Sequence, residues 1–132
     1  MQTHSFKILM TLLVLIAPRA WADDVIVIAH AGVQLTADEV RHVFVGDKQF
    51  AGTVKLTPID NAAVQSDFLA KAVKVDGGKY SSIWAKKSFR EGVNPPPLRG
   101  GDAEIILAVK STAGTIGYVR KAPEGVKIIG QY

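Results

Sequence analysis

The sequence predicts an α/β domain in which helices cover a mainly buried sheet. Residues 25–29 (VIVIA) form a continuous β-branched run without polar alternation, which is typical of a strand buried on both faces. Segments with helical spacing then alternate with further strand-like runs, in the order β-α-β-α-α-α-β-β. With 48% hydrophobic and 21% charged residues, the composition is that of a globular protein. A length of 132 residues allows one domain.

The first 22 residues have the pattern of a cleavable secretory signal peptide. Lys7 precedes an apolar run over residues 8–17, and Ala20 and Ala22 place small residues at the two positions that a signal peptidase reads. This run is too short to cross a hydrocarbon core that is about 30 Å thick. We therefore expect export, cleavage after Ala22, and a single domain over residues 23–132 that is not inserted in a membrane.

A capping box predicts the start of the first helix. Thr36 and Glu39 have the spacing at which each side chain can satisfy the backbone amide of the other at a helix N-terminus. Apolar residues then recur at helical spacing as far as Phe44, and Gly46 is placed to end the helix in a left-handed conformation. A short amphipathic helix is therefore expected after the first strand.

Residues 54–59 form a second extended run, which suits the edge of a sheet because Pro58 has no backbone N–H to donate. Asp60 or Asn61, which follow this run, can each cap the next helix. In residues 64–73 the apolar positions fall on one helical face, so we expect a second amphipathic helix there.

Gly77 and Gly78 are expected to end that helix, and a third helix is predicted over residues 79–90. Its apolar stripe places Trp84 in the core, and its Lys and Arg side chains are expected to form a solvated outer face. The following residues 92–101 contain three consecutive prolines, which fix φ and remove hydrogen-bond donors. They are expected to form an extended connector without regular structure.

The remaining elements complete the sheet and cover it. Residues 102–110 have the apolar spacing of a fourth helix. Residues 115–119 and 126–129 are β-branched runs, with turn residues at Gly114 and at positions 123–125. These two runs are predicted to be the closing strands.

No catalytic or metal-binding pattern is recognisable in the sequence. The lack of cysteine excludes disulfides, thiolate zinc sites and cysteine nucleophiles. No serine has the flanking glycines of a hydrolase nucleophile elbow, and His30 and His42 lack ligand-spaced partners. The net charge falls from +4 to +2 once Lys7 and Arg19 are removed with the signal peptide. So small an excess of positive charge does not indicate a nucleic-acid-binding protein. We therefore expect no enzyme activity, no cofactor and no metal.

Motifs along residues 35–119 match those of a known family. They are LTADEVRHVFVGDKQF (35–50), VKLTPID (54–60) with FLAKAV (68–73), IWAKKSFREGVNPPPL (83–98) and TAGTIGYV (112–119). Through them the chain resembles the small PstS-like members of the periplasmic substrate-binding proteins of phosphate ABC transporters. The resemblance implies one lobe of a type 2 periplasmic-binding-protein-like fold, with a central mixed sheet flanked by helices, located in the periplasm.

The resemblance also implies where a ligand would bind. After the second strand, full-length phosphate binders carry an Arg and a Ser-Gly-Thr-Arg sequence that holds the oxyanion at a helix N-terminus. Residues 60–66 of this chain lack that glycine, the threonine and both arginines, and Asp60 adds a negative charge. A helix N-terminus alone still attracts anions. The expected ligand contacts are therefore Asp60, Asn61, Ala62 and Ser66, with weak affinity for phosphate or another oxyanion.

Two functions remain open at this point. The first is a phosphate-transporter substrate-binding-like protein with at best weak oxyanion binding. The second is a non-transport accessory module that acts through protein–protein interaction. Full-length binders close two lobes around the ligand, whereas the 110 residues from Asp23 onward supply one. A protein partner or self-association would be needed to cover the open side of the ligand site.

Overall fold

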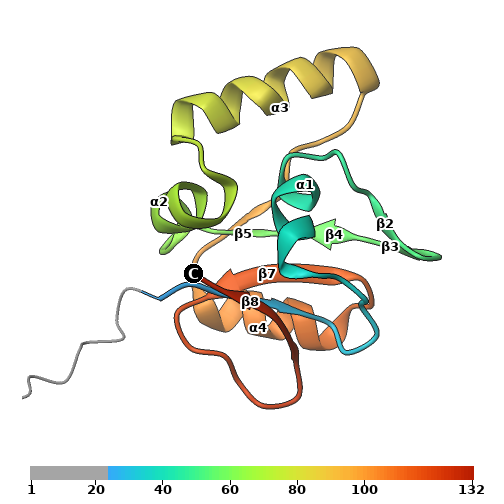
Figure 1. Cartoon of the computed structure of the whole chain (residues 1–132), viewed down its shortest axis with the longest axis vertical. Coiled ribbons are helices and arrows are strands. Elements are labelled where there is room, and N and C mark those ends of the chain that lie inside the picture. The colour runs from blue at the N-terminus through green and yellow to red at the C-terminus, as the bar shows by residue number, and fades with distance from the viewer. Residues whose placement is uncertain (1–23) are drawn as a thin grey trace, which may run out of the picture.

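The computed structural model describes residues 24–132 and has the α/β architecture expected from the sequence (Figure 1). The signal peptide expected over residues 1–22, with its cleavage site, lies outside the described residues. Within the part of the chain that is described, no helix is both long and apolar enough to span a membrane.

A four-stranded sheet with the order β4–β7–β1–β8 forms the centre of the fold (Figure 1). β1 (Ile26–Ala29) is antiparallel to both β7 (Thr115–Val119) and β8 (Lys127–Gln131), and β4 (Thr57–Pro58) is parallel to β7. The expected central mixed sheet is therefore confirmed. Pro58 lies in the edge strand β4, as expected, where its missing N–H breaks no ladder.

One face of the sheet is covered by α4 (Asp102–Ser111), close to the helix expected there. Its Ile105 and Val109 are fully buried with Ile28 of β1. The helix approaches β7 closely at Gly117, where a Cβ atom would lie 2.6 Å from Ile105 Cγ2. A larger residue at position 117 would push α4 away from the sheet.

The opposite face is covered by two short helical segments and, above them, a longer helix (Figure 1). The first segment is a 3-10 turn (Ala37–Glu39) that leads into α1 (Val40–Phe44). The second is α2 (Gln65–Phe68), which continues as a π-helical turn (Leu69–Val73). The outer layer is α3 (Gly77–Glu91). The strand β1 is thus buried on both faces, as its apolar run predicted.

The capping box expected at the first helix is confirmed. The Glu39 carboxylate accepts a hydrogen bond from the Thr36 amide at 3.1 Å and another from the Thr36 hydroxyl at 3.1 Å. After α1 the chain turns at Gly46, whose φ of 81° is in the left-handed region. A Cβ atom at Gly46 would lie 2.7 Å from Cη2 of Trp84, so glycine is required there for packing as well as for the turn.

Trp84 is confirmed as a core residue and fastens α3 to the layer below. Its side chain is only 6% exposed, and its indole N–H donates to the carbonyl oxygen of Phe44 at 3.0 Å. Phe44 in turn makes an edge-on contact with the ring of Phe68, with the centroids 4.7 Å apart. The aromatic rings thus link α3, α1 and α2 into one core.

The boundary expected at Gly77 and Gly78 is wrong. These glycines are the first residues of α3, and the Asp76 side chain caps the helix by accepting a backbone N–H at 2.7 Å. The preceding helical segment ends at Val73, and Lys74 takes the left-handed conformation with φ of 65°. The carboxylate of Asp76 satisfies free amides of the first turn, and this N-cap was the stronger local signal.

Two short pairings were not expected from the sequence. β2 (Phe50–Ala51) and β3 (Val54–Lys55) form an antiparallel hairpin, and β5 (Asp60–Asn61) pairs in parallel with β6 (Leu98–Arg99). Residues 92–101 are therefore not entirely irregular, because the extended proline segment leads into β6. This pairing brings the loop after β4 against the connector.

Candidate functional site

The candidate site lies where the parallel strands end. In open α/β sheets, ligands bind outside the carboxyl ends of the strands. Asp60 and Asn61 follow β4 at this edge, and Arg120 follows β7. Asp24 precedes the antiparallel strand β1 and therefore lies at the same edge. These groups come from three distant parts of the sequence.

Asp60 is buried between two tyrosines. Asp60 is only 2% exposed, and its carboxylate oxygens accept hydrogen bonds from Tyr80 Oη and Tyr118 Oη, each at 2.8 Å. Desolvation raises the pKa of Asp60, and the hydrogen bonds from Tyr80, Tyr118 and Gln65 offset this only in part. Desolvation, followed by the nearby carboxylate, raises the pKa of both tyrosines. Asp60 thus joins β5 to α3 and β7.

Asn61 is also an internal residue, with 0% exposure. Its Nδ2 donates to Asp102 Oδ1 at 2.7 Å and to the carbonyl oxygen of Tyr118 at 3.0 Å. Its Oδ1 accepts from the amide of Ala63 at 3.1 Å. All three functions of the carboxamide are therefore occupied by groups of the chain, and the side chain holds the loop against α4 and β7.

The backbone amides of this loop are occupied as well. The amides of Asp60 and Ala62 donate to carbonyl groups in and next to β6, both at 2.8 Å, and the Val64 amide donates to the carbonyl of Asn61 at 3.1 Å. The expectation that Asp60 or Asn61 caps the next helix is wrong, because the N-cap of α2 is Val64 and no side chain caps it. Pairing with β6 takes up the amide of Ala62, which a cap at Asp60 would have satisfied.

The four expected ligand contacts are not brought together in one open site. Asp60 and Asn61 face the interior, whereas Ala62 and Ser66 are exposed. Ser66 lines a shallow surface depression of about 540 Å³ with Lys74 and other residues at the start of α3. A conventional oxyanion cradle, with several free donors converging on one point, is therefore not formed by these residues.

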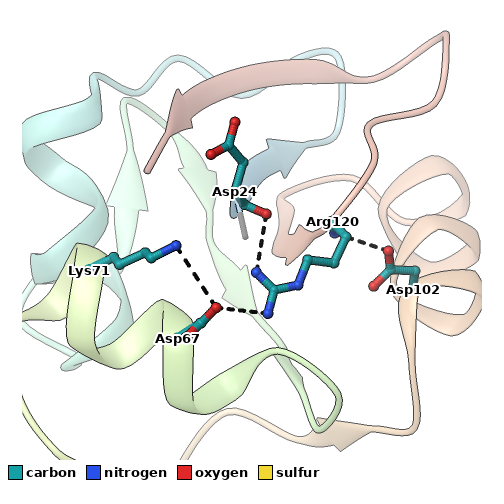
Figure 2. A network of polar contacts seen from close by, with 5 residues as sticks. All are labelled: Asp24, Asp67, Lys71, Asp102 and Arg120. Atoms are coloured by element: carbon teal, nitrogen blue, oxygen red, sulfur yellow. Dashed lines mark hydrogen bonds and ion pairs between the residues drawn. The ribbon is translucent and has the colours of Figure 1, made fainter. Parts of the chain in front are cut away.

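A charged network that the sequence did not predict lies at the same edge (Figure 2). Arg120 Nη2 donates to Asp67 Oδ2 at 2.8 Å, and Nη1 donates to the carbonyl oxygen of Asp24 at 3.3 Å. The backbone N–H of Arg120 donates to Asp102 Oδ2 at 3.0 Å. Lys71 Nζ lies 3.9 Å from the same oxygen of Asp67. One carboxylate thus faces two cations.

The network is open to solvent, unlike the Asp60 cluster. The side chains of Arg120, Lys71 and Asp67 are 33%, 35% and 41% exposed. Arg120 and, to a lesser degree, Lys71 hold the pKa of Asp67 below its ordinary value, so this carboxylate is ionised at neutral pH. Asp102 accepts hydrogen bonds from both Asn61 and Arg120 and therefore connects the buried loop to the exposed network.

Another depression, of about 480 Å³, lies on a different side of β4. It is lined by Trp84, Lys55, the prolines at 95–97 and neighbouring residues. Within residues 24–132, no group of three or more His, Cys, Asp and Glu side chains is placed to hold a metal ion. Neither observation adds a catalytic group to the candidate site.

The chain matches no protein family by sequence, and no curated protein shows significant similarity to it. Its fold is similar to that in the "Crystal structure of an ABC-type phosphate transport receptor from Vibrio cholerae", with a TM-score of 0.50 and 12% sequence identity. The match covers 80% of this chain and 44% of the receptor chain, so this protein corresponds to less than half of the receptor's length. At this identity the likeness concerns the fold alone.

Proposed function

We propose that this protein is an exported, single-lobe member of the type 2 periplasmic-binding-protein-like folds. It acts in the periplasm as a phosphate-transporter substrate-binding-like protein, with at best weak oxyanion binding. The observation that carries the proposal is the fold similarity to a phosphate transport receptor over 80% of the chain. The motifs along residues 35–119 and the signal-like first 22 residues support it.

The state of the loop at residues 60–66 sets the affinity that we expect. Its buried carboxylate, its carboxamide and several of its amides already have partners within the chain. An oxyanion entering this loop would have to break those bonds and approach Asp60, which costs desolvation without a compensating cation. We therefore infer a dissociation constant for phosphate no tighter than about millimolar, which corresponds to roughly 4 kcal/mol.

Isothermal titration calorimetry with phosphate tests this function. We expect saturable binding in the millimolar range that weakens as salt is added, because exposed charges are screened within about 10 Å at ~0.1 M salt. Titration of sulfate under the same conditions shows whether the site distinguishes between tetrahedral oxyanions. Micromolar binding would contradict the proposed affinity. If no saturable binding heat is seen even at phosphate concentrations well above millimolar, oxyanion binding itself is contradicted.

A second function, that of a non-transport accessory module, is favoured by one observation. Phe89 on the helix α3 is 92% exposed, and the neighbouring residues Lys86 and Arg90 of the same helix are exposed as well. Exposed aromatic residues of this kind are enriched in protein interfaces. A partner that the native protein captures in cells should not be captured by the Phe89→Ser variant. Sedimentation of the purified native protein and of the variant would show whether the partner is a second copy of the chain.

A further inference from the structure

Two cations from distant segments converge on one oxygen atom at the carboxyl edge of the sheet (Figure 2). Arg120, which directly follows β7, lies with Nη2 2.8 Å from Asp67 Oδ2. Lys71, in the π-helical turn, lies with Nζ 3.9 Å from the same oxygen. One guanidinium N–H group and one ammonium group thus lie beside the same oxygen, and both are donor types with which proteins bind phosphate and sulfate.

Contacts other than the one to Asp67 fix the position of Arg120. Its backbone N–H donates to Asp102 Oδ2 at 3.0 Å, and its Nη1 donates to the carbonyl oxygen of Asp24 at 3.3 Å. The orientation of the guanidinium group therefore does not depend on Asp67 alone. A cation that is already positioned loses less conformational entropy when it binds a ligand.

The Asp67 carboxylate is accessible to solvent and another anion can replace it beside its two cations, in contrast to the carboxylate of Asp60. Its side chain is 41% exposed, and ion pairs at this degree of exposure contribute little to stability. An external oxyanion can therefore displace the Asp67 carboxylate from its cations without any opening of the core. The buried Asp60 offers no such exchange, because its two tyrosine partners lie in the core.

The geometry points to an oxyanion site formed by Arg120 and Lys71, in which Asp67 is an internal competitor that keeps the affinity low. The site lies outside the carboxyl ends of β4 and β7, where α/β sheets bind ligands. This inference rests on the proposed function for the class of ligand, and it assigns the weak binding to residues outside the loop at 60–66. The ligand class is a small oxyanion, with inorganic phosphate as the probe.

The test compares phosphate titrations of the native protein with those of charge variants. Asp67→Asn keeps the size of the side chain and removes the competing charge, so affinity should rise by up to about fivefold, the largest factor that an exposed ion pair is usually worth. Arg120→Gln and Lys71→Gln should each weaken binding in the native and Asp67→Asn backgrounds. The matched control is Asp47→Asn, which removes the same charge from an exposed pair with Lys87 at 2.7 Å and should leave affinity unchanged.

Each outcome decides between the site and the proposed function. Stronger binding in Asp67→Asn that is lost in Lys71→Gln supports the site, even if Arg120→Gln fails to fold. Binding by Asp67→Asn but not by the native protein would uphold the site and refute oxyanion binding as the native function. Native binding that is unchanged in Asp67→Asn and Lys71→Gln would overturn the site and leave the function standing. An equal gain in Asp47→Asn, or no binding by any variant, would also overturn the site.

Discussion

Asp60 illustrates, at the scale of a single residue, how burial changes the role of a charged side chain. Its carboxylate is enclosed with the hydroxyl groups of Tyr80 and Tyr118, and desolvation raises its pKa. The native state therefore binds a proton at Asp60 more tightly than the unfolded chain does. The energetic consequence appears in the pH dependence of folding.

We predict that Asp60→Asn changes the pH dependence of stability in a defined direction. In the native protein, Asp60 lowers the free energy of unfolding as pH rises from its ordinary pKa of 3.8 through its raised native pKa. The Asn variant lacks this loss, so its stability relative to the native protein should increase with pH and then level off. Urea unfolding of both proteins between about pH 4 and pH 8 measures the difference. A difference that stays constant with pH would show that the pKa of Asp60 is not raised.

The sequence identified Asp60 as a notable charge but could not show its surroundings. Tyr80 and Tyr118 lie 20 and 58 residues away along the chain, and no local pattern connects them to Asp60. The pair of Arg120 and Asp67, separated by 53 residues, was missed for the same reason. Local spacing predicts caps and helical faces, whereas such contacts are created only when the sheet assembles.

The elements of the fold were predictable where their signals are local. The Thr36–Glu39 capping box and the apolar run of β1 were both confirmed, because each depends on neighbouring residues. The two-residue strands β5 and β6 were not expected, because so short a pairing carries no periodicity of its own. Gly77 and Gly78 were misjudged because glycine is common at the end of a helix and also tolerated in its first turn.

At the level of the elements, we predict that Trp84 makes a large contribution to holding α3 on the core. Trp84→Ala should lower the free energy of unfolding by about 3–5 kcal/mol, as expected for a large aromatic removed from a packed core. Phe89→Ala in the same helix is the matched control and should change it by less than about 0.5 kcal/mol, because this side chain is 92% exposed. Similar denaturation midpoints for the two variants would show that α3 is not anchored through Trp84.

The turn after α1 gives a second comparison between matched positions. Gly46→Ala must place a methyl group 2.7 Å from the Trp84 ring, at a backbone φ of 81°. Gly52→Ala, at φ of 61°, meets no atom within 4 Å and carries only the backbone cost of about 1 kcal/mol. Thermal unfolding should therefore show a larger loss for Gly46→Ala, by roughly 1–3 kcal/mol from overpacking. Equal losses would mean that the ring moves away without cost.

At the scale of the whole molecule, residues 24–132 form an α/β domain whose sheet is covered on both sides (Figure 1). The α/β class and the mixed sheet were predictable because buried strands and amphipathic helices leave strong patterns in the sequence. The arrangement of charges at the carboxyl edge was not, because it depends on which strand ends meet. The likeness to a phosphate transport receptor covers 44% of that receptor's chain and concerns the fold alone.

Export and cleavage of the predicted signal peptide also concern the molecule as a whole. If the first 22 residues are a signal peptide, protein recovered from the periplasm should begin at Asp23. Intact mass spectrometry distinguishes this form from the full chain directly. A periplasmic product that still contains the apolar run at residues 8–17 would contradict cleavage after Ala22.

The most direct measurement is a phosphate titration of isotope-labelled protein followed by the backbone amide resonances in NMR spectra. We predict fast exchange with millimolar affinity, and the largest shifts at the amides of Lys71 and Arg120. The amides of Ala62 and Ala63, which lie in the loop at residues 60–66 outside the proposed site, should move little. Tight binding in slow exchange, with the largest shifts at Ala62 and Ala63, would show that the loop at residues 60–66 holds the oxyanion and would contradict the account.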